Sequence, residues 1–275
     1  MGGTALTEKS PARIAAVPNP TTVALDTFDR VRLQARYWSA ADHGLACVVG
    51  HGFTGSSWTP AVERICRRLA DSGAAVLAPD FRGHGRSGGH STVGDLEVRD
   101  VAAAVAFLRA QAFRHVAVLG WSMGGSIMLR YAGLGGDADA VVSVSSPGAW
   151  FERGTRSMRL VHWLCEARLG RFACRVVRGT RLSPAGWVDI PEAPADVAGR
   201  ITPTPLLVVH GDADHYFPNR HVELLATAAP TASVWREPGM GHAEAATTPQ
   251  LVDRIAGWVR AVVGVDAVWD DGARD

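Results

Sequence analysis

The run from His115 to Tyr131 constrains the fold of this chain more than any other stretch. Its first residues, His115 to Leu119, are rich in valine, and a helical pattern resumes directly after Gly120-Trp-Ser-Met-Gly124. Because a strand that passes straight into a helix leaves little room, glycine is needed where the two backbones approach each other. The pattern therefore predicts that Ser122 lies on a strained turn, with its hydroxyl above a sheet and at the N-terminus of a helix.

Strand and helix patterns alternate over most of the chain. The first two strand-like segments predict an antiparallel hairpin, and the last six alternate with helical segments, which is typical of a mostly parallel sheet. We therefore predict an α/β fold with an eight-stranded, mostly parallel sheet flanked by helices. The strand segments are residues 21–26, 31–38, 46–50, 74–78, 115–119, 140–145, 206–210 and 233–236, and the main helical segments are 60–71, 93–113, 126–131, 219–228 and 249–263.

The alternation stops between residues 147 and 202. About fifty residues are too many for a simple connection between two strands, and this segment has a helical pattern of its own. We expect a core formed by residues 21–146 and 203–264, interrupted by a small helical insertion at 147–202. Residues 1–20 are expected to form a flexible leader, and residues 265–275 a frayed tail.

Composition excludes several functional classes. The net charge is +1, so there is no electrostatic case for nucleic-acid binding. No apolar run reaches about 18 residues, and the N-terminus lacks the apolar segment of a secretory signal. We expect a soluble cytoplasmic protein. The four cysteines show no C-x-x-C spacing, which favours buried free thiols at Cys47 and Cys66 over a Cys165–Cys174 disulfide.

A serine hydroxyl becomes nucleophilic when a base takes its proton, and the base works best when a carboxylate orients it. Two later strand segments lead into such residues. The segment 206–210 runs into Gly211-Asp212-Ala-Asp214, and the segment 233–236 runs into Gly241-His242. The resulting chain order is serine, acid, histidine.

These features resemble the α/β-hydrolase fold family, close to its esterase, lipase and monoacylglycerol-lipase-like members. The resemblance covers the chain from about Cys47 to His242. Its motifs are His51-Gly52, Asp80-x-Arg82-Gly83-x-Gly85-x-Ser87, Gly120-Trp-Ser122-Met-Gly124, Gly211-x-x-Asp214-x-x-x-Pro218 and Gly241-His242.

The resemblance implies a role for each matching residue. Ser122 would be the nucleophile, His242 the general base and then acid, and Asp214 the orienting carboxylate. The backbone N–H groups of Phe53 and Met123 would form the oxyanion hole, whereas the loop at Asp80 would be structural. The implied activity is serine hydrolysis of carboxylic esters, either an acyl ester or a monoacylglycerol-like lipid, through an acyl-enzyme. No cofactor and no metal is implied.

Alternatives to this assignment stay open. Asp212 is the rival of Asp214, because it follows Gly211 directly. The side chain of Asp212 could instead simply cap a turn, and the spacing to Pro218 favours Asp214 as the acid. Glu152 is a third acid candidate. A metal site formed by His210, Asp212, Asp214 and His215 is disfavoured, because side chains on a strand alternate between its faces.

The same catalytic residues would also support other reactions. These are thioester hydrolysis, C–C bond hydrolysis, acyl transfer and perhydrolysis. Outside enzymes, the fold could serve as a ligand-binding receptor or as a membrane- or partner-binding module. The sequence does not indicate the substrate or the oligomeric state.

In the resembling family, an insertion such as 147–202 covers the nucleophile as a cap or lid. One stretch of it is strongly amphipathic, with Arg168, Arg171, Arg175 and Arg178 opposite an apolar side. That side could form the wall of an acyl pocket together with Trp187, or it could only dock the insertion onto the core. As a third alternative, the arginines of the insertion could bind an anionic lipid or an acidic substrate. The apolar side comprises Cys165, Leu169, Phe172, Ala173, Val176 and Val177. The candidates for residues that line the pocket are His51, Trp121, Trp150 and Trp163. His51 is also expected to order the oxyanion loop.

Overall fold

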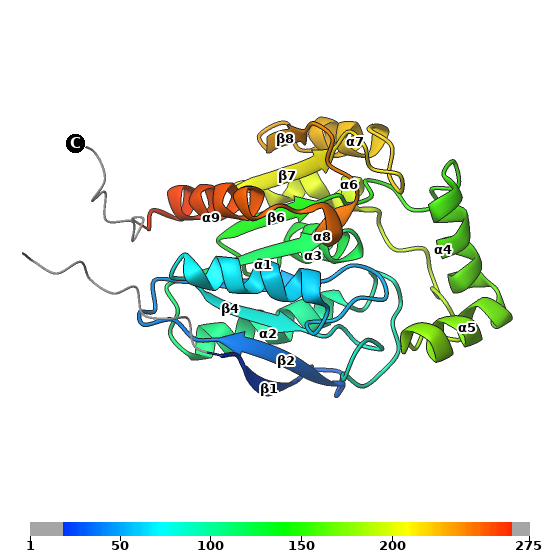
Figure 1. Ribbon diagram of the computed structural model, residues 1–275, viewed down its shortest axis with the longest axis horizontal. Coiled ribbons are helices and arrows are strands. Elements are labelled where there is room, and N and C mark those ends of the chain that lie inside the picture. The colour runs from blue at the N-terminus through cyan, green and yellow to red at the C-terminus, as the bar shows by residue number, and fades with distance from the viewer. Residues whose placement is uncertain (1–18, 266–275) are drawn as a thin grey trace, which may run out of the picture.

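The computed structural model describes residues 19–265 (Figure 1). The strands are β1 (Thr21–Asp26), β2 (Arg32–Trp38), β3 (Leu45–Gly50), β4 (Ala75–Pro79), β5 (His115–Trp121), β6 (Ala140–Val144), β7 (Leu206–Gly211) and β8 (Ser233–Glu237). The helices are α1 (Pro60–Asp71), α2 (Val98–Ala110), α3 (Met123–Gly133), α4 (Arg156–Glu166), α5 (Arg168–Arg178), α6 (Pro194–Ala198), the 3₁₀ turn η1 (Gly199–Ile201), α7 (Arg220–Ala228), α8 (Ala243–Ala246) and α9 (Pro249–Val263). Residues 1–18 and 266–275 lie outside the described residues. They include most of the leader expected at residues 1–20 and of the tail expected at 265–275.

The eight strands form one sheet in the order β1-β2-β4-β3-β5-β6-β7-β8. The β1–β2 and β2–β4 pairs are antiparallel, and the remaining neighbours are parallel. Parallel neighbours need a crossover connection. Helices α1, α2, α3 and α7 lie in these connections, and the β6–β7 connection contains α4, α5 and α6. The predicted α/β fold with an eight-stranded, mostly parallel sheet is confirmed.

Helices cover both faces of this sheet (Figure 1). Helices α1 and α9 pack on one face, and α2, α3 and α7 pack on the other. Side chains along β5 alternate between the two cores, since Val116 and Val118 belong to one and Ala117 and Leu119 to the other. A sheet buried on both faces explains why the central strands read as continuous apolar runs.

Close backbone contacts explain the two glycines that flank Ser122. A Cβ atom on Gly120 would lie 2.3 Å from the carbonyl of Gly124, and one on Gly124 would lie 2.3 Å from the carbonyl oxygen of Gly50. Any side chain at either position would therefore force β5, α3 and β3 apart. Ser122 itself has φ 52° and ψ −119°, which is strained for a residue other than glycine.

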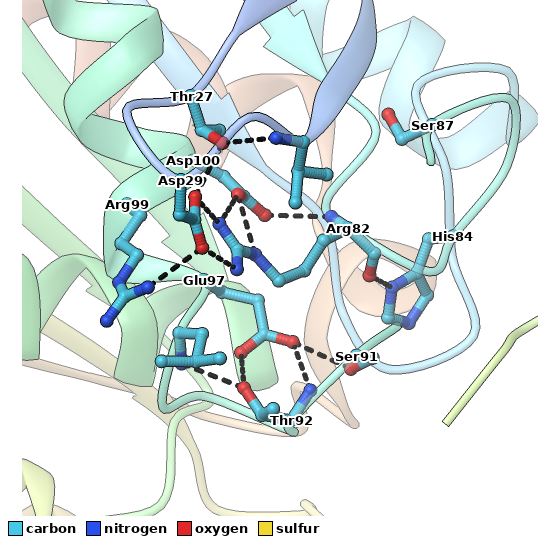
Figure 2. A network of polar contacts seen from close by, with 12 residues as sticks. Thr27, Asp29, Arg82, His84, Ser87, Ser91, Thr92, Glu97, Arg99 and Asp100 are labelled. Carbon is cyan, nitrogen blue, oxygen red and sulfur yellow. Dashed lines mark hydrogen bonds and ion pairs between the residues drawn. The ribbon is translucent and has the colours of Figure 1, made fainter. Parts of the chain in front are cut away.

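A buried polar network sets the start of α2 (Figure 2). Glu97 accepts hydrogen bonds from the Ser91 hydroxyl at 2.7 Å, from the Thr92 N–H at 2.8 Å and from the Gly94 N–H at 2.9 Å. These bonds hold residues 91–94 as an irregular loop. The helix predicted over residues 93–113 therefore begins only at Val98, because its first turn is replaced by this loop.

The same figure shows how the loop after β4 is fixed (Figure 2). The Arg82 guanidinium lies 2.8 Å from Oδ2 of Asp29 and donates from Nε to Oδ1 of Asp100 at 2.8 Å. Arg82 and Asp100 are both almost fully buried, so each compensates the other's loss of hydration. This network ties the β1–β2 turn and α2 to the loop that follows β4.

The insertion at residues 147–202, called here the inserted segment, contains α4, α5 and α6. Helices α4 and α5 lie at one end of the molecule, away from the two helical layers (Figure 1). They are two helices rather than one because the chain turns at Ala167, whose backbone is extended. A Cβ on Gly170 would lie 2.2 Å from the carbonyl oxygen of Trp163, so glycine is required where α5 crosses α4.

Two further sequence expectations concern cysteines and membrane spans. All four cysteines are free thiols, as expected for Cys47 and Cys66, and Cys165 and Cys174 form no disulfide. Between residues 19 and 265, no helix is both long enough and apolar enough to cross a bilayer.

Candidate active site

Ser122 lies where β5 ends and α3 begins. It occupies the N-cap position of α3 in a strained conformation, and it lines the cavity described below. The Ser122 Oγ atom lies 2.9 Å from Nε2 of His242, which comes 120 residues later in the chain. The serine is therefore hydrogen-bonded to a base and sits at the positive end of a helix.

His242 follows β8 and directly precedes α8. Its Nδ1 atom lies 2.8 Å from Oδ2 of Asp214, on the loop after β7. Because an ionised carboxylate only accepts hydrogen bonds, Nδ1 carries the proton, and Nε2 is left to accept from the Ser122 hydroxyl. The rings of Tyr216 and Phe217 pack on the imidazole at 4.2 and 5.5 Å between centroids, which holds its orientation.

The Asp214 side chain is fully buried and hydrogen-bonded on both oxygens. Its second oxygen accepts from the N–H groups of Tyr216 at 2.8 Å and Phe217 at 3.1 Å. Burial alone would raise the pKa of this carboxyl. The hydrogen bond and charge of His242, with the two N–H groups, outweigh burial and keep the pKa below its ordinary value. Asp214 is thus placed to remain ionised and to stabilise a protonated His242.

The two rival carboxylates have other partners. Asp212 accepts a hydrogen bond from the Gly239 N–H at 2.6 Å and so caps the turn after β8, away from His242. Glu152 lies 2.9 Å from Nε2 of His221 and also pairs with Arg220. Of the three acids, Asp214 is the one bonded to His242.

The ligand-type residues near Asp214 do not converge. Nε2 of His210 lies 3.0 Å from the carbonyl oxygen of Phe217, and the His215 ring packs beside Tyr216. Burial lowers the pKa of His210, so its imidazole is neutral. Within residues 19–265, no group of three or more His, Cys, Asp and Glu side chains is arranged to hold a metal ion.

Phe53 and Met123 line the same cavity as Ser122, which is described below. Met123 is the first residue of α3, where N–H groups have no partner inside the helix. Phe53 follows Gly52, whose carbonyl oxygen lies 2.8 Å from Nδ1 of His51 and accepts from the Gly55 N–H at 3.0 Å. His51 therefore orders this loop, and its Nε2 atom accepts in turn from the Phe81 N–H at 3.1 Å.

Comparisons with known proteins identify the family of this chain. A family model described as "Alpha/beta hydrolase family" matches residues 47–255. The chain belongs to the alpha/beta hydrolase family. This confirms the resemblance drawn from the motifs. In the structure, Ser122, Asp214 and His242 follow β5, β7 and β8, respectively.

Three known proteins are similar to this alpha/beta hydrolase in sequence or in fold. Pimeloyl-[acyl-carrier protein] methyl ester esterase of Aliivibrio salmonicida is 29% identical over 185 residues, which are 64% of this chain and 67% of that protein. Esterase Pf2001 of Pyrococcus furiosus superposes with a TM-score of 0.70 at 21% identity, covering 94% of this chain and 98% of that one. The alpha/beta hydrolase GrgF from Penicillium sp. sh18 gives 0.68 at 16% identity, covering 90% and 100%. The two structural matches show the shared fold.

A cavity of about 580 Å³ opens above Ser122 in this alpha/beta hydrolase. Its floor includes Ser122 and His242, and much of its wall comes from the inserted segment. Trp150 lines it as predicted, packs on Trp187 at 5.2 Å between centroids, and donates from its indole N–H to the carbonyl of Pro191 at 2.8 Å. The apolar wall is formed by Trp150, Phe151, Met158, Leu160, Val161, Leu164, Leu182, Trp187 and Phe217.

Three of the predicted pocket residues do not line this cavity. His51 is buried in the loop that it orders, so its ring faces Phe81 and His84 instead. Trp121 is buried behind the strand–helix turn, and its indole N–H donates to the Thr247 hydroxyl at 2.9 Å. Trp163 lies on the outer side of α4 and is exposed. The pocket assignment is therefore corrected for these three residues.

From the sequence, the apolar side of α5 was interpreted as the wall of a pocket or as a surface that docks onto the core, and the structure differs from both interpretations. Leu169, Phe172, Val176 and Val177 are between 64 and 75% exposed, so they neither wall the cavity nor dock onto the core. The buried positions of α5 are Gly170 and Cys174, and the helix contributes Arg171 and Arg178 to the cavity wall. One reason is the break at Ala167, which places Cys165 on α4 and separates it from the apolar side of α5.

Sequence reasoning missed Glu244. This residue is in α8, two positions after His242, and it lines the cavity beside Ser122. Its Oε1 atom accepts a hydrogen bond from the Gly52 N–H at 2.6 Å. The sequence carried no motif for this contact, since 192 residues separate the partners; only the proximity of Glu244 to His242 could have suggested it.

Proposed function

We propose that this alpha/beta hydrolase is a serine esterase that cleaves carboxylic esters through an acyl-enzyme. The observation that carries the proposal is the continuous hydrogen-bonded series from Ser122 through His242 to Asp214 on the floor of a largely apolar cavity. Nucleophile, base and orienting carboxylate lie within hydrogen-bond distance in the order that acyl transfer requires.

In the proposed mechanism, Ser122 attacks the ester carbonyl while Nε2 of His242 takes its proton. The N–H groups of Phe53 and Met123 stabilise the negative charge that develops on the carbonyl oxygen. His242 then gives its proton to the departing alcohol, which leaves an acyl group on Ser122. In the second half, His242 takes a proton from a water molecule that attacks the acyl-enzyme. His242 then returns this proton to the Ser122 Oγ atom as the acid is released. Asp214 holds the imidazole orientation and stabilises its positive charge in both halves.

The apolar wall supports an acyl chain or another apolar ester as substrate, and a monoacylglycerol-like lipid fits the same description. We propose that the inserted segment, residues 147–202, acts as a cap over Ser122, because α4 and the Trp150–Trp187 pair provide most of that wall. The methyl ester esterase and the esterase among the relatives support an oxygen ester. Thioester and C–C bond hydrolysis, acyl transfer and perhydrolysis use the same groups and are outcomes of the test below.

The test is pre-steady-state hydrolysis of p-nitrophenyl esters of increasing acyl length, beside thioesters with the same acyl groups. The proposal predicts a burst of one p-nitrophenol per chain, and a loss of turnover of at least about 1,000-fold in Ser122→Ala. Asp214→Asn should lose about 100-fold or more, whereas the matched variant Asp212→Asn should keep nearly wild-type turnover. Comparable ester turnover in Ser122→Ala, or a stronger loss in Asp212→Asn than in Asp214→Asn, would contradict the assignment.

We further propose that the cap makes peripheral contact with anionic lipid. Helix α5 presents Leu169, Phe172 and Val176 to solvent along one side, next to the exposed Arg168 and Arg175. Eight arginines occur from Arg153 to Arg181, whereas the acidic residues from position 152 to 181 are Glu152 and Glu166. Glu152 already pairs with Arg220, and Glu166 with Arg153. An exposed apolar stripe flanked by unneutralised arginines is the pattern of a helix that lies in a lipid interface.

Vesicle flotation tests this contact. We expect binding to vesicles of phosphatidylcholine with phosphatidylglycerol, weaker binding at high salt, and several-fold weaker binding in Phe172→Ser. Phe28→Ser is the matched control, because Phe28 on the β1–β2 turn is also largely exposed, at 76% against 64% for Phe172. Absence of binding to the anionic vesicles, or equal binding to pure phosphatidylcholine, would overturn the proposal.

The cytoplasmic location expected from the sequence stays a prediction.

A further inference from the structure

Glu244 places a carboxylate at the nucleophile, yet the proposed steps of ester hydrolysis do not use it. Its Oε1 atom accepts from the Gly52 N–H at 2.6 Å. A Cβ placed on Gly52 would lie 3.3 Å from both carboxylate oxygens of Glu244 and 3.3 Å from Cβ of Ser122. The carboxylate, Gly52 and the nucleophile therefore surround one point on the cavity floor.

The backbone bends sharply to bring Glu244 there. Ala243, between His242 and Glu244, is buried and has φ 52°, in the left-handed region that residues other than glycine rarely adopt. This conformation lets residues 242 and 244 both line the cavity from the short α8 region. Strain of this kind persists only where the surrounding contacts hold it, and such positions cluster at functional sites.

Gly52 is held from both sides. Its carbonyl oxygen is bonded to the His51 ring and the Gly55 N–H, and its own N–H is bonded to Glu244. In a trans peptide the N–H points opposite to the carbonyl, so the orientation of the Gly52 carbonyl sets the direction of the Phe53 N–H. Because glycine lacks a Cβ, these hydrogen bonds, rather than steric limits, must fix the two peptide planes.

We propose that Glu244 is a positioning residue for the oxyanion hole, acting through Gly52 to hold the Phe53 N–H in the direction that stabilises the oxyanion. The inference rests on the proposed esterase function. What the site requires of Glu244 is its hydrogen-bond acceptor, since a full negative charge at this place opposes the oxyanion. Glutamine keeps an acceptor of the same length without the charge, whereas alanine removes both.

The test compares Glu244→Ala and Glu244→Gln with wild type in ester hydrolysis. We expect kcat to fall about 10- to 100-fold in Glu244→Ala with a much smaller change in KM, because a displaced N–H donor weakens the transition state more than the bound ester. Glu244→Gln should stay within about threefold of the wild-type kcat. Glu223→Ala is the matched control, since it removes an exposed carboxylate from α7.

A second measurement separates positioning from a general loss of structure. A trifluoromethyl ketone adds to the serine and places an oxyanion in the hole, whereas the corresponding secondary alcohol binds without forming one. We expect the affinity for the ketone to fall in Glu244→Ala in parallel with kcat, and the affinity for the alcohol to stay nearly constant. Thermal unfolding of each variant shows that the fold is retained.

Three results would overturn the inference. The first is a kcat for Glu244→Ala within threefold of wild type while Ser122→Ala is inactive, which leaves the esterase proposal intact. The second is an equal loss of kcat in Glu244→Gln and Glu244→Ala, which would assign the effect to charge. The third is ester turnover that survives in Ser122→Ala, which would overturn the esterase proposal together with the inference.

Discussion

At the scale of single residues, the turn at Ser122 combines strain with close packing. The serine has a positive φ, and the flanking glycines leave no room for a Cβ against the backbones of residues 50 and 124. Strain of this kind costs on the order of 1–3 kcal/mol per residue. The molecule retains it because β5 and α3 are both fixed by the surrounding core, and the strained turn is what presents the hydroxyl.

Replacing the strained serine by glycine should therefore stabilise the fold. We predict that Ser122→Gly raises the free energy of unfolding by about 1 kcal/mol, with a thermal midpoint about 2 °C higher, while ester hydrolysis is lost. Ser126→Gly, in the regular part of α3, should lower stability by about 0.5–1 kcal/mol or more, since its hydroxyl also donates to the Met123 carbonyl. Calorimetry of both variants decides the matter, and a Ser122→Gly protein less stable than wild type would refute the strain argument.

At the scale of elements, the inserted segment is anchored where its chain leaves β6. Glu152 is buried there and accepts hydrogen bonds from His221 and Arg220 of α7, and from the Gly154 N–H just before α4. The Thr155 hydroxyl donates to the Tyr216 carbonyl at 3.0 Å, beside the ring that packs on His242. The beginning of the inserted segment is therefore fastened to the same loop that carries Asp214.

This anchor predicts a specific pH dependence of stability. Burial would raise the pKa of Glu152, but its bonds to His221 and Arg220 outweigh burial and lower the pKa from 4.5 to about 2. A carboxyl whose pKa is lowered by folding stabilises the protein above its unfolded pKa, and this contribution disappears as the pH falls through the folded pKa. Glu152→Gln should therefore cost on the order of 1–3 kcal/mol between pH 5 and 8, and progressively less from about pH 4.5 towards 2.

Urea unfolding of wild type and Glu152→Gln across this pH range measures the difference. Glu223→Gln, on the exposed side of α7, serves as the control and should show almost no pH-dependent difference. A constant gap between wild type and Glu152→Gln from pH 7 down to pH 3 would show that the charge of Glu152 does not contribute.

At the scale of the whole molecule, the sheet gathers residues that are far apart in the chain. Parallel strands end at one edge, so the loops after β5, β7 and β8 meet there, and 120 residues separate Ser122 from His242. Helices α4 and α5 of the inserted segment lie at one end of the molecule (Figure 1), and the segment provides much of the wall of the cavity. The strand order, together with the inserted segment, thus brings a serine, a histidine, a carboxylate and an apolar wall into one site.

Local patterns explain why the fold class was predictable from the sequence. Valine-rich runs and glycines at crowded turns act over a few residues, so the eight strands and the strand–helix turn at Ser122 could be located. Contacts between distant segments could not. Glu244 reaches Gly52 across 192 residues of chain, so no sequence spacing shows this contact. Two local features were not predicted either: Glu97 binds residues 91–94, just before it, and so delays the start of α2, and the break between α4 and α5 depends on one extended residue at Ala167.

The central claim is that Ser122 is a nucleophile activated by His242 and Asp214. The most direct measurement is mass spectrometry of the protein after reaction with a fluorophosphonate, which phosphonylates an activated serine and releases fluoride. The account predicts one adduct per chain, mapped to Ser122, with labelling strongly slowed in His242→Ala and absent in Ser122→Ala. An unlabelled wild-type protein, or an adduct on another residue that persists in Ser122→Ala, would contradict it.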